Sequence, residues 1–378
     1  MNFFLLYYCI PSIIGNICLT WVEKESNIYS KGEINMTLVN NQFILAERPQ
    51  GMPDGNTFNV VQKNVEEIKK NQILIKTLYV SVDPYMRGRM EDAESYVEPF
   101  EVNQVIEGGS IGEVIESKSN HFNQGDLVIG SFGWQEYFTA TDKDIRKIDP
   151  TLAPITTHLG ILGMTGLTAY FGLLEIGQPK KGETVVISGA AGAVGSTVGQ
   201  IAKLKGARVV GIAGSDEKIN YLKEELHFDE GINYRTTKDI TKDLKQACPK
   251  GIDVYFDNVG GEISDAVFTQ INRYARIPVC GAISAYNLEK VDVGPRVQTM
   301  LIKNSAMMQG FTVGNYSKKF GEASMQLGQW LQEGKLTYRE TIREGFDSIP
   351  DAFLDLFKGN NLGKLLVKVA EPQFTDKK

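Results

Sequence analysis

The spacing of apolar and polar residues differs between two regions of the chain. From Val39 to about Ile148, short segments alternate apolar and polar positions between Gly, Asn and Asp, as in QILIKTLYVSV, EVNQVIEGGSIGEVIES and DLVIGSFGWQEYFTA. A period of two is typical of strands that bury one face. The first region is therefore predicted to be rich in β-strands.

A different pattern follows Pro154. The segment GILGMTGLTAYFGLLEIG has apolar residues at helical spacing and ends at Gly177, where we expect a helix C-cap. Segments typical of strands then alternate with segments typical of helices. The expected strands are ETVVISGA, ARVVGIAG, GINY, GIDVYFDNV and ARIPVCGAI, and the expected helices are AVGSTVGQIAKLKG, DEKINYLKEELH, TKDITKDLKQAC and EISDAVFTQINR. This alternation predicts an α/β domain with a parallel sheet and helices on both faces.

The tail returns to strand-like segments from about Tyr338 and ends in GKLLVKVA. A chain of 378 residues is long enough for two domains of ordinary size. A tail of strands could rejoin the first region, which would make the α/β domain an insertion.

Composition narrows the classes of partner. Apolar residues make up 42% and charged residues 23% of the chain, which is typical of a soluble globular protein. The net charge of −6 disfavours nucleic acid and anionic membranes as partners, because both require a concentrated basic face.

Cysteine and histidine are sparse. The four cysteines form no CxxC pair, and the three histidines stand far apart in the sequence, so no local group offers the ligands that zinc requires. We therefore expect a reducing compartment and no metal site.

A glycine-rich motif follows the first strand of the α/β region. ETVVIS leads directly into GAAGAVGSTVGQ, with Gly189, Gly192 and Gly195 in GxxGxxG spacing. Between a strand and a helix, such glycines let the backbone approach a pyrophosphate at the helix amino end, where unpaired N–H groups attract anions. Ala193 and Val194 would then contribute their N–H groups. The alternative is a turn kept only for tight strand–helix packing.

The next strand lacks the acid that NAD-preferring proteins use to hold the ribose hydroxyls. It ends in Ala213-Gly214-Ser215, with no carboxylate before Asp216, and Lys218 follows in the next helix. Small residues leave room for a 2′-phosphate, and a lysine can neutralise it. The cofactor is therefore predicted to be NADPH.

Several motifs together resemble a known family. They are VSVDPYMRGRM, LGMTGLTAYFGLLEIG, GAAGAVGSTVGQIAKLKGARVVGIAGSDEK, YFDNVGGE, CGAISAYN and KGNNLGK. From about Met36 to Val369 the chain resembles the zinc-independent medium-chain dehydrogenase/reductases. The match is to the branch that holds prostaglandin reductases (leukotriene B4 12-hydroxydehydrogenases), 2-alkenal double-bond reductases and curcumin-reductase-like enzymes.

The resemblance implies a GroES-like β-rich domain and a Rossmann NADPH-binding domain with the active site between them. We expect the first domain to span 36–157 and 340–378, and the second 158–339. Zinc-dependent relatives carry a metal-binding Cys where this chain has VDPY, and Gly-His-Glu where it has Ile106-Glu107-Gly108-Gly109. The resemblance thus also argues against zinc, and it implies a homodimer.

The reaction implied by the resemblance is reduction of a carbon–carbon double bond conjugated to a carbonyl, in a small enal or enone. NADPH gives hydride to the β-carbon, and charge moves to the carbonyl oxygen as an enolate. Tyr286 of CGAISAYN is the candidate catalytic residue, because a neutral tyrosine can donate to that oxygen. Tyr85 of VDPYMR is the candidate substrate-binding residue.

Other cofactor contacts come from the resemblance alone. Tyr234 and Lys218 would flank the 2′-phosphate, and Asn258 would lie near the nicotinamide half. The segment Cys280, Gly281, Ala282, Ile283 and Ser284 would border the nicotinamide, together with Phe311, Thr312 and Val313, and Asn361 would close over it. Cys280 lacks a partner base in the sequence and is expected to pack in a strand.

Two other functions stay open at this point. A zinc-free quinone oxidoreductase would share the fold and the cofactor, but VDPYMR and GAISAYN favour the double-bond reductase. A non-enzymatic NADPH-binding protein would be expected to have a degraded pocket, whereas both tyrosines are present.

The amino terminus raises a separate question. MNFFLLYYCIPSIIGNICLTW carries no charge, and its length would suit a membrane span or a signal peptide. However, Pro11 and Gly15 interrupt the run, no basic residue precedes it, and no Ala-x-Ala cleavage site follows.

The residues before Met36 suggest a different origin. Lys31-Gly32-Glu33 can be encoded by AAAGGAGAA, which contains a bacterial ribosome-binding sequence, and Ile34-Asn35 gives suitable spacing before Met36. We therefore expect residues 1–35 to be mostly translated leader or a disordered extension. The working protein is then expected to start at Met36 in the cytoplasm.

Overall fold

The computed structural model describes residues 38–151 and 153–374. The expected leader, residues 1–35, lies outside them. Among the described residues, no helix combines the length and the apolar character needed to cross a membrane.

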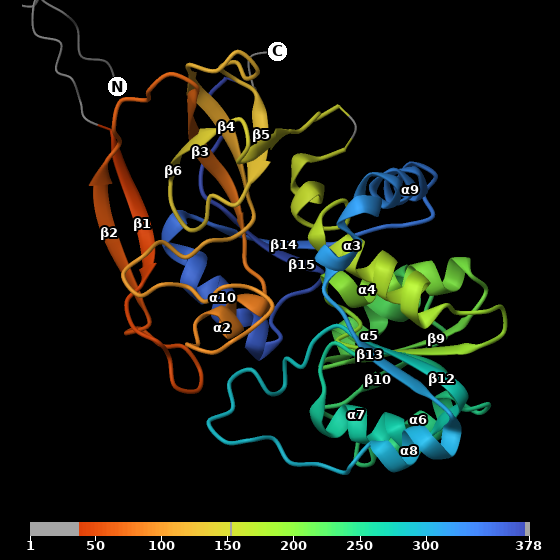
Figure 1. Ribbon diagram of the computed structural model, residues 1–378. Helices are drawn as coiled ribbons and strands as arrows, with labels where there is room; N and C mark the ends of the chain where they lie inside the picture. The colour runs from red at the N-terminus through yellow and green to blue at the C-terminus, as the bar shows by residue number, and fades with distance from the viewer. Residues whose placement is uncertain (1–37, 152, 375–378) are drawn as a thin grey trace, which may run out of the picture. The chain divides into compact units, whose positions relative to one another are not determined.

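The first region is a set of β-sheets, as its alternating pattern predicts (Figure 1). Its main sheet has the order β14-β15-β3-β4-β5-β7, with β6 also pairing with β3, and β1 and β2 form a separate two-stranded sheet. The strands are β1 (Val39–Leu45), β2 (Phe58–Asn64), β3 (Gln72–Ser81), β4 (Ser110–Ser117), β5 (Leu127–Gly130), β6 (Tyr137–Thr141), β7 (Ile145–Lys147), β14 (Glu340–Glu344) and β15 (Lys364–Lys368).

The C-terminal strands belong to this main sheet. Strand β15 pairs antiparallel with β3 and parallel with β14, so the tail does return to the first region. The two domains are thus a GroES-like β-rich domain and an α/β domain inserted in it. Their limits at 157/158 and 339/340 stay predictions.

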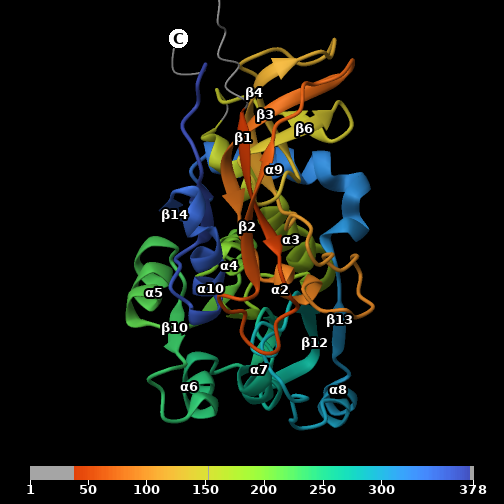
Figure 2. The same cartoon turned by 90° about the vertical axis from the view of Figure 1, so that its left-hand side faces the viewer.

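The α/β domain contains a parallel six-stranded sheet in the order β10-β9-β8-β11-β12-β13. Figure 2 shows β10 and β13 at opposite edges of this domain. Its strands are β8 (Thr184–Ser188), β9 (Arg208–Ala213), β10 (Glu230–Asn233), β11 (Ile252–Phe256), β12 (Ile271–Val279) and β13 (Met307–Gly310).

Helices cover both faces of this sheet. The helices within residues 38–151 and 153–374 are α2 (Tyr85–Arg89), η1 (Ile155–Leu159), α3 (Met164–Phe171), η2 (Gly172–Gly177), α4 (Ala193–Leu204), α5 (Asp216–Asn220), η3 (Tyr221–Glu225), α6 (Ile240–Ala247), α7 (Gly261–Phe268), α8 (Gln298–Asn304), η4 (Val313–Lys319), α9 (Phe320–Gln332), η5 (Phe346–Ser348) and α10 (Ile349–Lys358). Val185 and Ile187 of β8 pack with α3, α4 and α9, whereas Val186 packs with α6, α7 and α8. Alternate residues of one strand therefore supply the two cores, which explains why the three central residues of β8 are all apolar.

Two predicted helix ends were wrong. The segment expected to end with a C-cap at Gly177 has its left-handed residue at Gln178 (φ 43°), whose N–H bonds to the Leu173 carbonyl. The helix expected to reach Arg273 ends at Phe268. A tight turn follows it, and Ile271 then starts β12 by pairing with Ile252.

The prediction of strand-like segments through the tail was wrong for α10. Ile349, Ala352 and Phe353 are buried at helical spacing against Trp134 and its neighbours. Pro350 lies in the first turn of the helix, the one place where proline fits a helix without cost.

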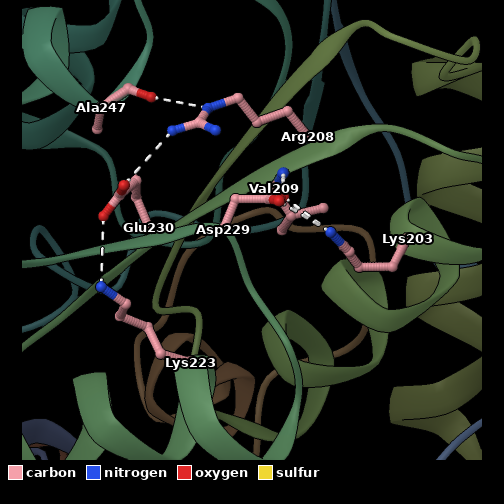
Figure 3. A network of polar contacts seen from close by, with 7 residues as sticks. All are labelled: Lys203, Arg208, Val209, Lys223, Asp229, Glu230 and Ala247. Carbon is pink, nitrogen blue, oxygen red and sulfur yellow. Dashed lines mark hydrogen bonds and ion pairs between the residues drawn. The ribbon is translucent and has the colours of Figure 1, made fainter.

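An ion-pair network fastens the amino ends of β9 and β10 (Figure 3). Asp229 accepts the Val209 N–H at 2.7 Å and pairs with Lys203 at 2.9 Å. Glu230 pairs with Arg208 and Lys223, and the Arg208 guanidinium also donates to the Ala247 carbonyl. The charged side chains of this network are therefore paired with one another at the amino ends of β9 and β10. The network does not extend to the carboxyl ends of these strands.

Candidate functional site

The three glycines after β8 have three different roles. Gly189 has a φ of +59°, which other residues rarely adopt, and a Cβ at Gly195 would lie 2.4 Å from the Gly189 carbonyl oxygen. A Cβ at Gly192 would meet only that same oxygen, at 3.4 Å. Tight packing therefore explains Gly195, whereas the backbone at Gly192 stays open to an approaching group.

The amino end of α4 faces this open position. Gly192 is its N-cap, and among the described residues no side chain caps the helix there. Ala193, Val194 and Gly195 form the first turn, where N–H groups have no partner within the helix. Such an end attracts phosphate oxygens, so the turn fits a pyrophosphate.

Strands β9 and β10 end side by side. Asn233 pairs with Ala213, which puts Gly214 and Tyr234 together: a Cβ at Gly214 would lie 3.0 Å from the Tyr234 hydroxyl oxygen. Glycine at this position lets the tyrosine lie across the strand end. The next residue, Ser215, caps α5 by accepting the Lys218 N–H.

Two cations meet at these strand ends. The Lys218 ammonium donates to the Gly359 carbonyl at 2.9 Å, and the Arg235 guanidinium donates to the Lys358 carbonyl at 2.7 Å. Burial, and then the nearby Arg235 charge, lower the pKa of Lys218. Among the described residues both cations have carbonyl acceptors and neither forms an ion pair, so an anion would be favoured between them.

Arg235 was missed by sequence reasoning. It directly follows Tyr234, just past the end of β10, and its guanidinium lies 5.8 Å from the centre of that tyrosine ring. The sequence did offer a signal for it, because Arg235 is a basic residue directly after Tyr234, which was predicted to contact the 2′-phosphate.

Asp257 is a buried hub, also missed from the sequence, at the carboxyl end of β11. It is 3% exposed and accepts hydrogen bonds from the hydroxyls of Ser188, Tyr255 and Ser264 and from two backbone N–H groups. Because it lies beside the end of β8, it joins the glycine-rich turn to the segment that follows β11.

Asn258 is fixed by this arrangement. Its N–H donates to the Ser188 hydroxyl at 2.9 Å and its side-chain amide to the Ser188 carbonyl at 2.7 Å. A Cβ at Gly189 would lie 3.5 Å from the Asn258 Cβ. The structure therefore places Asn258 against the glycine-rich turn.

The segment from Cys280 to Ser284 lies over the same hub. The N–H groups of Cys280 and Gly281 donate to the Asp257 carbonyl, and those of Ile283 and Ser284 donate to the carbonyls of Asn258 and Val259. Burial raises the pKa of the Cys280 thiol to about 12. Cys280 is thus protonated at neutral pH and packs against the core cluster to which α3 and α4 contribute.

Tyr286 folds back over this segment. Its hydroxyl oxygen accepts the Ala282 N–H at 3.3 Å, and a Cβ at Gly281 would lie 3.0 Å from it. Burial raises the pKa of Tyr286, and the Ala282 N–H opposes that rise only in part. The hydroxyl therefore keeps its proton at neutral pH. Since it uses a lone pair toward Ala282, its proton is available to another acceptor.

Tyr85 begins α2 and lines a pocket of about 450 Å³ with residues that include Ser81, His158 and Met164. Burial raises its pKa, and the Asp83 charge adds to the rise, so it is also a neutral donor. Tyr286 is not among the residues that line this pocket.

A buried ion pair holds the turn before Tyr85. Asp83 and Lys364 pair at 3.2 Å with side chains 7% and 5% exposed, and the ammonium also donates to the carbonyls of Val82 and Leu365. The VDPY and NNLGK motifs, distant in sequence, are thus one structural unit.

The NNLGK segment also contacts the glycine-rich turn. The Gly363 N–H donates to the Ala191 carbonyl at 2.8 Å, and Gly363 pairs with Gly192 as an isolated bridge. Asn361, whose side-chain amide donates to the Gly363 carbonyl, is therefore close to the amino end of α4.

The segment of Phe311, Thr312 and Val313 follows β13. Phe311 lies edge-to-face with Phe256, with ring centres 6.3 Å apart, and would touch any side chain at position 172. The Thr312 hydroxyl donates to the Asn315 side chain and the Thr312 carbonyl accepts the Asn315 N–H at the start of η4. Val313 packs against the core.

No cluster of three or more His, Cys, Asp or Glu side chains suited to a metal ion occurs within the described part of the chain. The expectation of a zinc-free site stays a prediction.

This combination of a GroES-like domain, a parallel nucleotide-binding sheet and an open glycine-rich turn defines a dinucleotide-dependent oxidoreductase. A family model described as the N-terminal domain of oxidoreductase matches residues 41–148, and one described as zinc-binding dehydrogenase matches residues 193–329.

Individual relatives give the same result over most of the chain. The chain is 63% identical over 339 residues to YfmJ of Bacillus subtilis (strain 168), which is provisionally named an NADP-dependent oxidoreductase; the match covers 89% of this chain and all of YfmJ. It is 43% identical to the NADPH-dependent curcumin reductase of Escherichia coli (strain K12), over 88% of this chain and 97% of that protein.

A solved structure matches as well. The crystal structure of CurA from Vibrio vulnificus in complex with NADPH superimposes with a TM-score of 0.83 at 42% identity, covering 88% of this chain and 100% of that one. The chain belongs to the medium-chain dehydrogenase/reductase family, in the branch of prostaglandin, 2-alkenal and curcumin reductases.

Proposed function

We propose that this protein is an NADPH-dependent reductase of carbon–carbon double bonds conjugated to a ketone or aldehyde. The observation that carries the proposal is the Tyr286 hydroxyl. It accepts a backbone N–H from a segment tied to the nucleotide-binding sheet and keeps its own proton to donate. Relatives named curcumin reductase and 2-alkenal reductase support this reaction class.

The described residues fit NADPH at both ends. The uncapped amino end of α4 and the open backbone at Gly192 suit the pyrophosphate. Lys218 and Arg235, with Tyr234 beside them, suit a 2′-phosphate, because no carboxylate at the end of β9 would repel it. When bound, NADPH supplies the hydride that reduces the β-carbon of the substrate.

The protein's own contribution is to bind and stabilise charge on the substrate. As negative charge develops on the carbonyl oxygen, the Tyr286 O–H donates a hydrogen bond to it and can then release its proton. Tyr85 offers a second neutral hydroxyl from its pocket, where it binds and orients the substrate. The hydrogen bonds of Asp257 and Asn258 hold the segment after β11 in place beside the glycine-rich turn.

The test is a steady-state assay of the purified protein with NADPH against enals, enones, quinones and simple ketones. The proposal expects turnover of enals and enones with the saturated carbonyl compound as product. Reduction of quinones alone would identify the protein as a quinone oxidoreductase. NADPH binding without turnover of any of them would indicate a binding protein.

We propose further that the protein is a cytoplasmic homodimer. Strand β13 is an edge of the parallel sheet, and all four of its residues are exposed, so it could pair with the same strand of a second copy. Light scattering after size exclusion tests this: the mass of one chain across the accessible concentration range would contradict it.

A further inference from the structure

The side chain of Arg87 connects segments that are distant in the sequence. It is 2% exposed, although arginine is almost never buried without partners. Its guanidinium donates to the Gly51 carbonyl at 2.9 Å, to the Pro49 carbonyl at 3.4 Å, and to the Asn287 side-chain oxygen at 3.0 Å. The remaining partner is Glu91, at 3.0 Å and 52% exposed.

The positions of these partners relate to the two tyrosines. Arg87 lies in α2 two residues after Tyr85, and Asn287 directly follows Tyr286. The bond from Arg87 Nε to Asn287 Oδ1 therefore joins the two tyrosine-bearing segments across 200 positions of sequence.

The loop that contains Gly51 reinforces the connection. Gly51 is buried with a φ of +74°, and a Cβ there would lie 3.1 Å from the Glu289 carboxylate oxygen. The loop thus contacts the segment after Tyr286 while its carbonyls accept from Arg87. A planar guanidinium with donors in a fixed fork can hold several acceptors at once, which a lysine cannot do.

We propose that Arg87 is a positioning residue that fixes the Tyr286 segment against α2, so that Tyr85 and Tyr286 act on one substrate. Of the two tyrosines, Tyr85 lines the pocket of about 450 Å³ and Tyr286 does not. The position of Tyr286 relative to a substrate therefore depends on how its own segment is held. The inference rests on the proposed double-bond reduction.

The first test uses Asn287→Ala, which removes one acceptor and leaves Arg87 its other partners. A hydrogen bond to a charged group suggests a loss of about tenfold or more in kcat on an enone, with the NADPH dissociation constant within about twofold of wild type. The matched control is Glu91→Gln, which weakens the exposed partner of the same guanidinium and should leave kcat unchanged. Unchanged kcat and KM in Asn287→Ala would overturn the inference.

The second test separates positioning from general weakening of the fold. If Asn287 acts through Tyr286, then Asn287→Ala should lower kcat little further once Tyr286→Phe has removed the hydroxyl. Equal fold-losses in both backgrounds would mean that the contact only supports the fold, and the inference would fail.

The third test needs neither NADPH nor turnover. In the cofactor-free protein, hydrogen–deuterium exchange of residues 281–288 should become faster in Asn287→Ala and in Arg87→Lys, and stay at the wild-type rate in Glu91→Gln. Unchanged exchange in both of the first two variants would contradict the contact itself. A wild-type protein that reduces no enone would refute the proposed function instead, because this measurement would still report on Arg87.

Discussion

Two sites in the molecule differ in how their charged side chains are paired. One is the turn before Tyr85, and the other is the carboxyl end of β9 and β10. Asp83 and Lys364 are both buried and neutralise each other at 3.2 Å. Within the described part of the chain, the side chains of Lys218 and Arg235 instead donate to uncharged carbonyls, those of Gly359 and Lys358. One region has a balanced pair, and the other keeps two positive charges.

This difference separates a structural role from a binding role. A balanced buried pair has no charge left for a ligand, so it fixes the turn that carries Tyr85. Two cations whose hydrogen-bond acceptors are neutral carbonyls gain when an anion arrives, because charge-assisted hydrogen bonds to phosphate are stronger than those to neutral oxygens. The unbalanced charge at the β9–β10 end therefore supports the proposal that this end binds an anion.

The largest expected effect comes from breaking the balanced pair. Lys364→Met leaves the Asp83 carboxylate buried without a cation, which typically costs about 3–5 kcal/mol of unfolding free energy. Urea denaturation measures the loss. The double variant Asp83→Asn/Lys364→Met removes both charges and should recover part of it. A single variant as stable as wild type would show that the pair does not hold this turn.

The next effect concerns Tyr286, the proposed proton donor. Tyr286→Phe should lower kcat on an enone by about ten- to a thousandfold, as expected for one missing donor to a developing oxyanion. The affinity for NADPH should stay unchanged, because the Tyr286 hydroxyl is proposed to contact the substrate and not the cofactor. Single-turnover kinetics and NADPH fluorescence titration measure the two effects. Wild-type turnover would transfer the role to Tyr85, the cofactor ribose or water.

The pH dependence follows from the raised pKa of Tyr286. Because burial favours the neutral form, the donor persists above the ordinary tyrosine value of about 10. The wild-type kcat should therefore show no decline caused by this group between pH 6 and roughly 10. A fall near pH 8 that Tyr286→Phe abolishes would contradict this expectation.

These sites differ in how far the sequence could predict them. Gly189 and Tyr234 each lie just past the end of a strand, and Lys218 lies in the helix that follows β9. Alternation of strands and helices was therefore enough to bring them to one edge of the sheet. The β-rich region and the α/β domain with its parallel sheet followed from the same periodicity, whereas the GroES-like assignment came from the resemblance. The residue roles assigned by resemblance alone, including those of Tyr286 and Tyr85, stay predictions.

What the sequence could not supply were contacts between distant segments. Nothing local in VDPY indicates that Asp83 pairs with Lys364, 281 positions later, or that Arg87 reaches Asn287. Helix α10 was missed for a related reason: Pro350 suggests a break, and only burial against Trp134 shows why the segment is helical.

A smaller effect is expected at the unbalanced end. Lys218→Ala should weaken NADPH binding by about 1–3 kcal/mol, the range for charge-assisted hydrogen bonds, and leave NADH binding nearly unchanged. Arg235→Ala should likewise reduce the preference for NADPH over NADH. Fluorescence titration with both cofactors measures it. Equal losses for NADPH and NADH would sink the 2′-phosphate assignment.

The smallest effect tests the opposite ends of the same two strands. Glu230 is 41% exposed and pairs with Arg208 at 3.6 Å and Lys223 at 3.4 Å (Figure 3). Exposed pairs contribute little because water and salt screen them, so Glu230→Gln should change the unfolding free energy by less than about 1 kcal/mol. Its NADPH affinity should equal that of wild type, since cofactor contacts are proposed at the carboxyl ends alone. A change in cofactor preference comparable to that of Lys218→Ala would mean that charge acts over the whole β9–β10 edge, and the contrast between balanced and unbalanced regions would fail.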